Sequence, residues 1–353
     1  MRGLLVSIVI AMLLLSACSK KEKAEDTIPV LKENENPVIV EEEPEPEEEP
    51  VMLYKSPFTG VFSEEENTHR PVLATINNHP LARPQSGISD ADIIYELAAE
   101  GEITRLLALF QSELPEEMGP IRSARDYFIH IAKGLDAFYV AHGYSPDAKQ
   151  LLQSRFVDNV NGMQYDGTLF QRSKERKAPH NSYISGDNVL AAMEKTNSPI
   201  EMSLIPVFSF HESIESAKIG DIASMLVVRS GTNPDFTSTY AYDGEIGTYN
   251  RMVNGILTVD KSGEKPVALA NVIVLETTFR TIDNVGRQSV DIESGGKGML
   301  FHAGIAKEIE WKNIDGILTP MESGVPAKLV PGKTWIHIVS NKPGMATTVT
   351  YTP

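Results

Sequence analysis

The chain has 353 residues, of which 41% are hydrophobic and 23% are charged, and its formal net charge is −16. An acidic chain of this kind is a poor candidate for nucleic-acid binding, which needs a basic face. Because Cys18 is the only cysteine, an intramolecular disulfide, a thiolate metal site and an iron–sulfur cluster are excluded.

The first residues have the pattern of a bacterial secretory signal. Arg2 gives a basic start, and the apolar run from Leu4 to Leu15 is shorter than the roughly 20 residues of a membrane-spanning helix. The segment Leu15-Ser16-Ala17-Cys18 resembles the lipobox of lipoproteins, whose cysteine is acylated after cleavage. We therefore expect residues 1–17 to be the signal peptide and Cys18 to anchor the protein to the bilayer on its extracytoplasmic side. A plain signal peptide and an uncleaved anchor are the alternatives.

Residues 18–67 are predicted to be a disordered stalk. Between Ser19 and Met52 there are four lysines and twelve acidic residues, and Glu41–Pro50 reads EEEPEPEEEP. Such a segment cannot bury apolar area, repels itself and favours extended backbone. We expect it to hold the folded part away from the lipid surface, the alternative being a solvated tail without a role.

The folded part opens with three strand-like runs at Pro71–Asn77, Asp92–Ala98 and Ile103–Gln111. A continuous helix over residues 90–111 competes with the second and third runs, and Gly101 is the one residue that argues against it. A buried strand is expected at Ala137–Ala141. Helices with serine N-caps are predicted at Asp126–Gly134 (Ser123), Asp147–Gln153 (Ser145) and Asp187–Lys195 (Ser185).

After about residue 212 the pattern changes to short β-rich runs separated by Gly, Pro, Asp and Asn turns. We therefore predict an α+β protein, in which a mixed α/β N-terminal part (residues 68–212) precedes a mainly antiparallel β C-terminal part (residues 213–353). The predicted strands are Met225–Arg229, Ser238–Asp243, Gly255–Asp260, Ala268–Glu276, Gly298–Ala303, Thr334–Val339 and Ala346–Tyr351.

Several motifs together resemble the YerB-like family of bacterial lipoproteins. They are RPVLATINNHPLARPQSGISDADIIYELAAEGEITRL, GPIRSARDYF, APHNSY, TYAYDGEIGTYNR, NVIVLET, GGKGMLFHAG and PGKTWIHIV. The resemblance covers essentially the whole folded part. It implies a two-part domain in the bacterial envelope, and it implies no activity, because the family is one of unknown function.

Polar side chains with fixed geometry lie among the apolar runs of the N-terminal part, where they are costly unless paired. The candidates for a ligand-binding or purely structural polar network are Arg83, Glu96, Glu100, Arg105, Arg122, Arg125, His142, His180 and Asn181. Arg105 has apolar neighbours, so we expect it to pair with Glu96 or Glu100. Arg122 lies near a helix start, where cations are disfavoured, so we expect it to face an anionic partner.

Two classes of function remain open. The first is a binding module of the cell envelope that holds a partner protein or a cell-wall fragment. The second is a wall-directed hydrolase, with Glu96 and Glu100 as acid and base or with a serine and a histidine, either His142 with Ser145 or His180 with Ser182. The sequence favours the binding module, because no G-x-S-x-G or histidine metal motif is present. We expect no metal and no cofactor, and the oligomeric state stays open.

Overall fold

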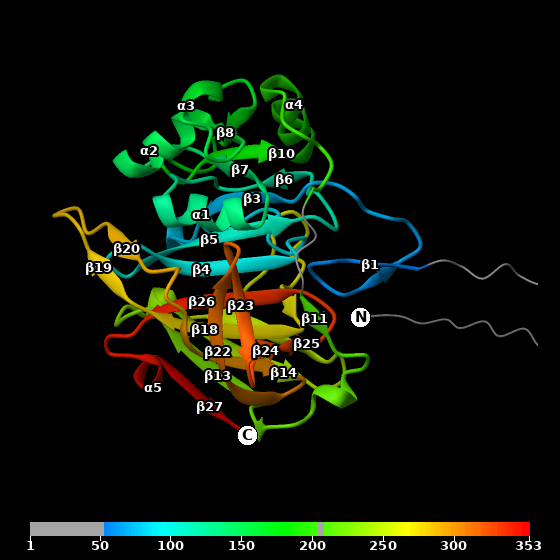
Figure 1. Ribbon diagram of the computed structural model, residues 1–353. Helices are drawn as coiled ribbons and strands as arrows, with labels where there is room; N and C mark the ends of the chain where they lie inside the picture. The colour runs from blue at the N-terminus through cyan, green and yellow to red at the C-terminus, as the bar shows by residue number, and fades with distance from the viewer. Residues whose placement is uncertain (1–52, 204–207) are drawn as a thin grey trace, which may run out of the picture. The chain divides into compact units, whose positions relative to one another are not determined.

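The computed structural model describes residues 53–203 and 208–353. Its largest element is a mixed sheet of 12 strands that crosses the middle of the molecule (Figure 1). The strands lie in the order β24 (Val325–Pro326), β23 (Ile317–Glu322), β22 (Ile305–Ile314), β21 (Gly296–His302), β18 (Asn271–Thr277), β26 (Thr334–Ser340), β4 (Ile93–Glu100), β5 (Ile103–Phe110), β3 (Val72–Asn77), β7 (Phe138–Ala141) and β8 (Asn159–Asn161), and β12 (Asp221–Ile222) pairs with β22.

Smaller sheets and helices surround this sheet. The six-stranded sheet contains β16 (Ile256–Leu257), β15 (Thr248–Val253), β14 (Thr237–Asp243), β13 (Met225–Arg229) and β27 (Val349–Thr352), with β17 (Ala268–Leu269) beside β15. The other sheets are β6 (Glu117–Met118), β10 (Ser182–Ser185) and β9 (Phe170–Arg172); β1 (Tyr54–Lys55) and β2 (Phe62–Ser63); β11 (Ser209–Phe210) and β25 (Lys328–Leu329); and β19 (Phe279–Thr281) and β20 (Gln288–Val290). The helices are α1 (Asp126–Gly134), α2 (Pro146–Gln153), α3 (Gly162–Tyr165), α4 (Gly186–Thr196) and α5 (Met345–Thr348).

One pairing joins strands from the two halves of the sequence. β4 pairs in parallel with β26 over Ile93–Leu97 and in antiparallel fashion with β5. The large sheet therefore contains strands from both sides of residue 212, and residues 51–353 form one compact unit. The division into domains at residue 212 stays a prediction.

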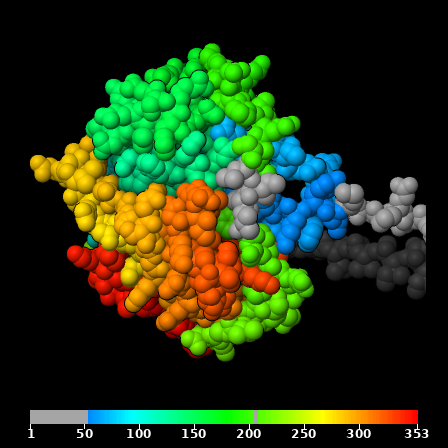
Figure 2. Space-filling view, viewed as in Figure 1, coloured from blue at the N-terminus to red at the C-terminus, as the bar shows by residue number. Residues whose placement is uncertain are grey.

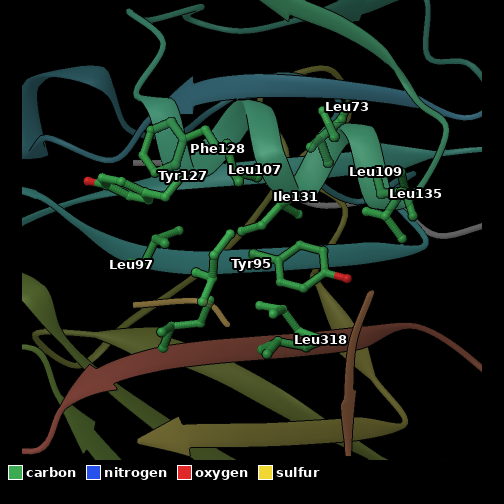
Figure 3. Packing of buried hydrophobic residues seen from close by; sticks show 14 of the residues in the cluster. Leu73, Tyr95, Leu97, Leu107, Leu109, Tyr127, Phe128, Ile131, Leu135 and Leu318 are labelled. Atoms are coloured by element: carbon green, nitrogen blue, oxygen red, sulfur yellow. The ribbon is translucent and has the colours of Figure 1, made fainter. Parts of the chain in front are cut away.

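The central strands are buried on both faces, which explains why their sequences are almost continuously apolar. One face packs against α1 through Leu73, Tyr95, Leu97, Leu107 and Leu109 (Figure 3). The alternate residues of the same strands pack, on the opposite face, in one cluster with Leu226, Val228 and Tyr240 of the six-stranded sheet. Any polar side chain on β4 or β5 must therefore find its partners inside one of these two cores.

The structure confirms the strands predicted near residues 71–77, 92–98 and 103–111 as β3, β4 and β5. The alternative of one helix over residues 90–111 is wrong, because Gly101 adopts a φ of +52° in the turn of a β4–β5 hairpin. The helices α1, α2 and α4 are confirmed, and the hydroxyls of Ser145 and Ser185 cap α2 and α4 as predicted.

Three local predictions are wrong. Ser123 does not cap α1: the N-cap is Arg125, and the Ser123 hydroxyl donates to the His142 carbonyl at 3.2 Å. The run Gly255–Asp260 contributes only the two residues of β16, because Asp260 turns away to bind Ser262 and the amide of Ser89. The run Ala346–Tyr351 begins inside α5 and becomes the strand β27 only at Val349.

The predicted stalk ends too late. β1 and β2 form a hairpin within residues 54–63, and the Phe58 side chain at its turn is fully buried. Its ring lies 6.2 Å from that of Phe208. Residues 1–52, which include Cys18 and most of the predicted stalk, lie outside the described residues. Among the described helices, none has the length and apolar composition needed to cross a membrane.

Candidate functional site

The side chains of Glu96 and Glu100 point to opposite faces of β4. In a regular strand, residues four apart share a face. Here the register with β5 shifts between Ala98 and Glu100, which is the signature of a β-bulge. Glu96 consequently contacts Arg251 of the six-stranded sheet, whereas Glu100 contacts Arg125 at the start of α1. The predicted acid–base pair of Glu96 and Glu100 is therefore not formed.

Glu96 is the centre of a buried network. Its Oε1 accepts hydrogen bonds from Asn78 Nδ2 (2.9 Å) and Thr104 Oγ1 (3.0 Å), and its Oε2 accepts from Arg251 and from Trp335 Nε1, both at 3.1 Å. The Arg251 guanidinium also lies over the Trp335 ring, 4.3 Å from its centroid. The Glu96 side chain has 0% exposure, so its four hydrogen bonds replace the water that burial removes.

The Glu96 network continues through His337 to Tyr240. Burial acts to raise the pKa of the Glu96 carboxyl, but Arg251 and His337 outweigh it, and the pKa is lowered. Burial lowers the pKa of His337 to about 4, so its imidazole is neutral near pH 7. Tyr240, whose pKa is raised by burial, donates its phenol proton to His337 Nε2 at 2.6 Å. These groups bind one another and are closed to solvent, which identifies a structural network, although Arg251 Nε and His337 Nδ1 have no hydrogen-bond partner among the described residues.

Glu100, Arg105 and Arg125 form a second structural cluster on the α1 side of the sheet. Arg105 donates to both Glu100 oxygens, at 2.8 and 2.9 Å, and to the Ser123 carbonyl at 2.5 Å. Arg125 forms a salt bridge with the same carboxylate. Burial lowers the pKa of Arg105 to about 10, so its guanidinium keeps its charge at neutral pH. The sequence-based expectation that Arg105 pairs with Glu96 or Glu100 is confirmed for Glu100.

A third group lies where the carboxyl ends of two parallel strands meet, a common position for ligands in α/β sheets. β3 leads to His79, and β7 leads to His142. Arg122 connects them, because its amide donates to the Thr75 carbonyl (2.8 Å) and its carbonyl accepts from the His142 amide (2.9 Å). The neighbouring Ile121 amide donates to the Ser182 carbonyl. This hydrogen bond holds the segment that contains His180 next to Arg122. We call Arg122, His79, His142 and His180 the Arg122 cluster.

Arg122 differs from the other arginines of this region. Its half-buried guanidinium forms no hydrogen bond or salt bridge with any residue among 53–203 and 208–353. Burial, and then the nearby charge of Arg105, lower its pKa to about 10, so it keeps its charge at pH 7. A largely desolvated cation without a counter-charge is unfavourable by itself and is stabilised by an anion.

Two histidines place further donors next to Arg122. The Asn77 amide oxygen accepts from the His79 amide (3.0 Å), so its Nδ2 donates to His180 Nδ1 (2.8 Å). His180 must therefore carry its proton on Nε2. His79 Nδ1 accepts from the Leu81 amide at 3.2 Å, which places the proton of that ring on Nε2 as well. The two rings stack with centroids 4.7 Å apart, and neither Nε2 has a protein partner in the described part of the chain.

The pKa of His180 is lowered by burial and then by the nearby His79 and Arg122. The ring is therefore neutral near pH 7 and offers a hydrogen bond rather than a full charge. Arg122, His79 and His180 together supply a guanidinium fork and two imidazole N–H groups. No carboxylate of the described residues pairs with the Arg122 guanidinium. Such a donor set suits a carboxylate or phosphate group.

His142 is paired differently from either predicted combination. Ser145 caps α2, and the partner of His142 Nδ1 is Ser182 Oγ at 2.7 Å. His142 Nε2 lies 3.0 Å from the Arg172 guanidinium, which can only donate. The imidazole proton is therefore on Nδ1 and is donated to Ser182, so this histidine cannot take a proton from that serine. Asp166 binds Arg172 and not the histidine.

The predicted candidates thus fall into three groups. Arg83 joins the Glu96 network by donating a hydrogen bond to Asn78 Oδ1. Asn181 Oδ1 accepts a hydrogen bond from the Arg172 guanidinium at 3.1 Å. Ser182 was predicted as a partner of His180 and instead contacts His142. His79 and Arg172 were not predicted, although the position of His79 two residues after a predicted strand was a usable signal. Within the described residues, no group of three or more His, Cys, Asp or Glu side chains is arranged to hold a metal ion.

Comparisons with known proteins agree with this architecture. The model described as "Protein of unknown function (DUF3048) N-terminal domain" matches residues 58–199, and the model of the DUF3048 C-terminal domain matches residues 226–336. The chain is 44% identical over 288 residues to "Putative lipoprotein YerB" of Bacillus subtilis, covering 81% of this chain and 86% of that protein.

A crystal structure of the YerB protein from Bacillus subtilis superimposes with a TM-score of 0.78 at 41% identity. The similarity covers 85% of this chain and 100% of the crystallised chain. The residues matched by the two DUF3048 models include Glu96, Arg251 and Trp335, the Glu100 cluster and the Arg122 cluster. The chain therefore belongs to the YerB-like lipoprotein family, whose two DUF3048 domains are of unknown function.

Proposed function

We propose that this protein is a binding module of the cell envelope that holds an anionic ligand at the Arg122 cluster. The observation that carries the proposal is the half-buried Arg122 guanidinium, which lacks a counter-charge among the described residues. The Nε2–H groups of His79 and His180 are the second support, because they also lack protein partners there. The ligand is a carboxylate or phosphate group of a cell-wall fragment or of an envelope protein.

The anchoring part of the proposal rests on the first 18 residues. The apolar run and Leu15–Cys18 favour a lipid on Cys18, and the Bacillus subtilis relative is itself named as a lipoprotein. Acyl chains contribute about 0.8 kcal/mol per buried CH₂, so a diacylated cysteine holds the protein at the outer face of the cytoplasmic membrane. Cys18→Ala should release the protein from membranes or leave an unprocessed precursor. An unlipidated mature protein that begins at another residue would refute this assignment.

A wall-directed hydrolase is the second candidate, and the contact between His142 and Ser182 is the observation that favours it. The proton position on His142 argues against it, because the serine accepts rather than gives a hydrogen bond there. Ser182 is also buried, with an exposure of 1%. Turnover of purified wall material that disappears in Ser182→Ala would establish the hydrolase instead of the binding module.

The direct test uses the full chain in detergent and muropeptides released from cell walls by lysozyme. Calorimetric titration should give binding by the parent and at least about a tenfold weaker affinity for Arg122→Gln, equivalent to about 1.4 kcal/mol. Arg280→Gln is the matched control, since Arg280 is exposed and forms no salt bridge within the described residues. Equal affinities of the parent and Arg122→Gln would refute the assignment of the site.

A further inference from the structure

A large groove lies away from the Arg122 cluster and shares no residue with it. It has a volume of about 940 Å³ and is lined by the end of β4, the β13–β14 loop, the β19–β20 hairpin and residues 338–348. In Figure 2 the yellow-orange segment with β19 and β20 and the red C-terminal segment, both lining segments, lie near each other at the left edge of the molecule. This volume is at the upper end of the range of about 300–1,000 Å³ for small-molecule sites.

Serine and threonine are the most frequent of the residues that line this groove. Eight of its lining residues are serine or threonine, among them Thr237, Thr239, Thr347 and Thr348. Hydroxyls both donate and accept hydrogen bonds and rotate to suit the ligand. The half-buried Phe279 adds one aromatic surface. A surface with many hydroxyls and one apolar platform suits a ligand that alternates hydroxyl groups with small apolar faces, as a sugar does.

The ionisable groups of the groove favour a negatively charged ligand. Arg229 and Lys342 are its two cations; Arg229 has only a 3.3 Å hydrogen bond to Thr350, and neither forms a salt bridge with a described residue. Glu102 is its one carboxylate, and it already accepts from the Thr232 amide (2.9 Å), the Thr232 hydroxyl (3.0 Å) and the Asn233 amide (2.8 Å). Glu102 therefore fixes the loop, and the two cations remain for a ligand.

The strand pairing argues against an extended peptide that adds to the main walls of the groove. A peptide that adds to a sheet needs a strand edge with unpaired backbone groups. Four of the strands that reach this groove, β4, β13, β14 and β26, each pair with a neighbour on both sides, whereas β19 and β20 pair only with each other. At these four strands, recognition must therefore come from side chains and from the loop backbones at Gly101, Gly231 and Gly255.

The walls of the groove are held in place before any ligand binds. The Gly101 amide donates to the Gly286 carbonyl at 2.8 Å and ties the β4–β5 turn to the β19–β20 hairpin. Inside that hairpin, Gln288 Nε2 donates to Thr281 Oγ1 at 3.1 Å. Little ordering is left for the ligand to impose, which favours affinity.

We propose that this groove is a second binding site, specific for an acidic oligosaccharide. Arg229 and Lys342 pair with its anionic groups, the threonines bind its hydroxyls, and Phe279 packs against a sugar face. The site is independent of the proposed anion site at Arg122, because the two share no residue.

The test titrates the full chain in detergent with tetragalacturonate, a linear acidic oligosaccharide, and with chitotetraose, a neutral one. Tetragalacturonate should bind with a Kd of about 1 mM or tighter. Arg229→Gln/Lys342→Gln should weaken binding at least tenfold, whereas Lys297→Gln/Lys312→Gln, which removes two exposed lysines of the β21–β22 hairpin, should not. Lys342→Gln alone, at an exposed position, should weaken binding by a smaller factor and serves if the double variant does not fold.

Arg122→Gln should bind tetragalacturonate like the parent, which separates failure at this groove from failure at the Arg122 cluster. The proposal is overturned if tetragalacturonate does not bind at about 1 mM, or if chitotetraose binds equally well. An equal loss of affinity in the Lys297/Lys312 control would also overturn it, because that result would show that affinity depends on the net charge of the protein and not on the residues of the groove.

Discussion

Glu96 and Arg251, separated by 155 positions in the sequence, form a buried ion pair, in which Oε2 and the guanidinium lie 3.1 Å apart. Glu96 is on β4 in the large sheet, and Arg251 is on β15 in the six-stranded sheet. Trp335 of β26 donates to the same carboxylate oxygen. The pair therefore connects the two sheets at the place where β4 and β26 join the halves of the chain.

Glu96→Gln should destabilise the protein by about 3–5 kcal/mol, because it leaves the Arg251 cation buried without a counter-charge. Arg251→Met should destabilise the protein by a similar amount, because it leaves the Glu96 carboxylate buried without a counter-charge. The double variant should lose less than the sum of the two single losses, since it removes both charges. Urea unfolding of the four proteins measures this cycle. Additive losses would show that the two side chains do not interact in the folded state.

Arg105→Ala should cost about 3–5 kcal/mol, because Glu100 would lose one of the two arginines that neutralise it inside the protein. Arg122→Ala should cost less than about 1 kcal/mol, since this side chain has no partner among the described residues. Arg280→Ala serves as the exposed control. Chemical unfolding of the three variants measures these losses of unfolding free energy. If Arg122→Ala is destabilised as much as Arg105→Ala, Arg122 stabilises the fold and is not a ligand-binding residue.

Stability should fall as the pH is lowered below about 6.5, the ordinary histidine value. Burial lowers the pKa of His302 to about 3 and that of His337 to about 4. Both rings stay neutral in the folded protein while the unfolded chain takes up their protons. Their contribution is thus complete above pH 6.5 and is lost toward pH 4, at about 1.4 kcal/mol per pH unit for each ring. The lowered pKa values of His142, His180 and His211 act in the same direction.

His302→Leu tests the contribution of a single histidine to this pH dependence. Both ring nitrogens of His302 lack a hydrogen-bond partner among the described residues, so the substitution removes no hydrogen bond found there. Between pH 6.5 and 4.5, unfolding of the variant should take up about one proton fewer than unfolding of the parent. The slope of the unfolding free energy against pH should therefore be smaller by about 1.4 kcal/mol per pH unit. His130→Gln, at an exposed position, should leave the slope unchanged. A slope in His302→Leu equal to that of the parent would mean that His302 is protonated in the folded state.

Local sequence was sufficient for several elements of the N-terminal part, among them β3, β4, β5, α2 and α4. Ser145 and Ser185 stand immediately before their helices, and a guanidinium at Arg105 inside an apolar strand required a carboxylate nearby. In each case the interaction is decided by residues close in sequence or by a single strong physical cost.

The rest depends on register and on long-range pairing, which local patterns do not encode. The bulge after Ala98 places the Glu100 side chain on the opposite face of β4 from Glu96, and no residue type at that position predicts the bulge. The parallel pairing of β4 with β26 joins residues about 240 positions apart, and it brings Trp335 to Glu96. The contact of His142 with Ser182 likewise requires β10 to lie beside the end of β7.

The anion site at Arg122 is tested most directly by titrating inorganic phosphate into the full chain while the imidazole ¹⁵N and ¹H resonances are followed by NMR. The His180 Nε2–H resonance should shift and saturate with phosphate at pH 7 in the parent and in Arg280→Gln, because this N–H is donated to the bound anion. Arg122→Gln should show no saturable shift. A His180 resonance that ignores phosphate in the parent, or responds equally in Arg122→Gln, would contradict the account.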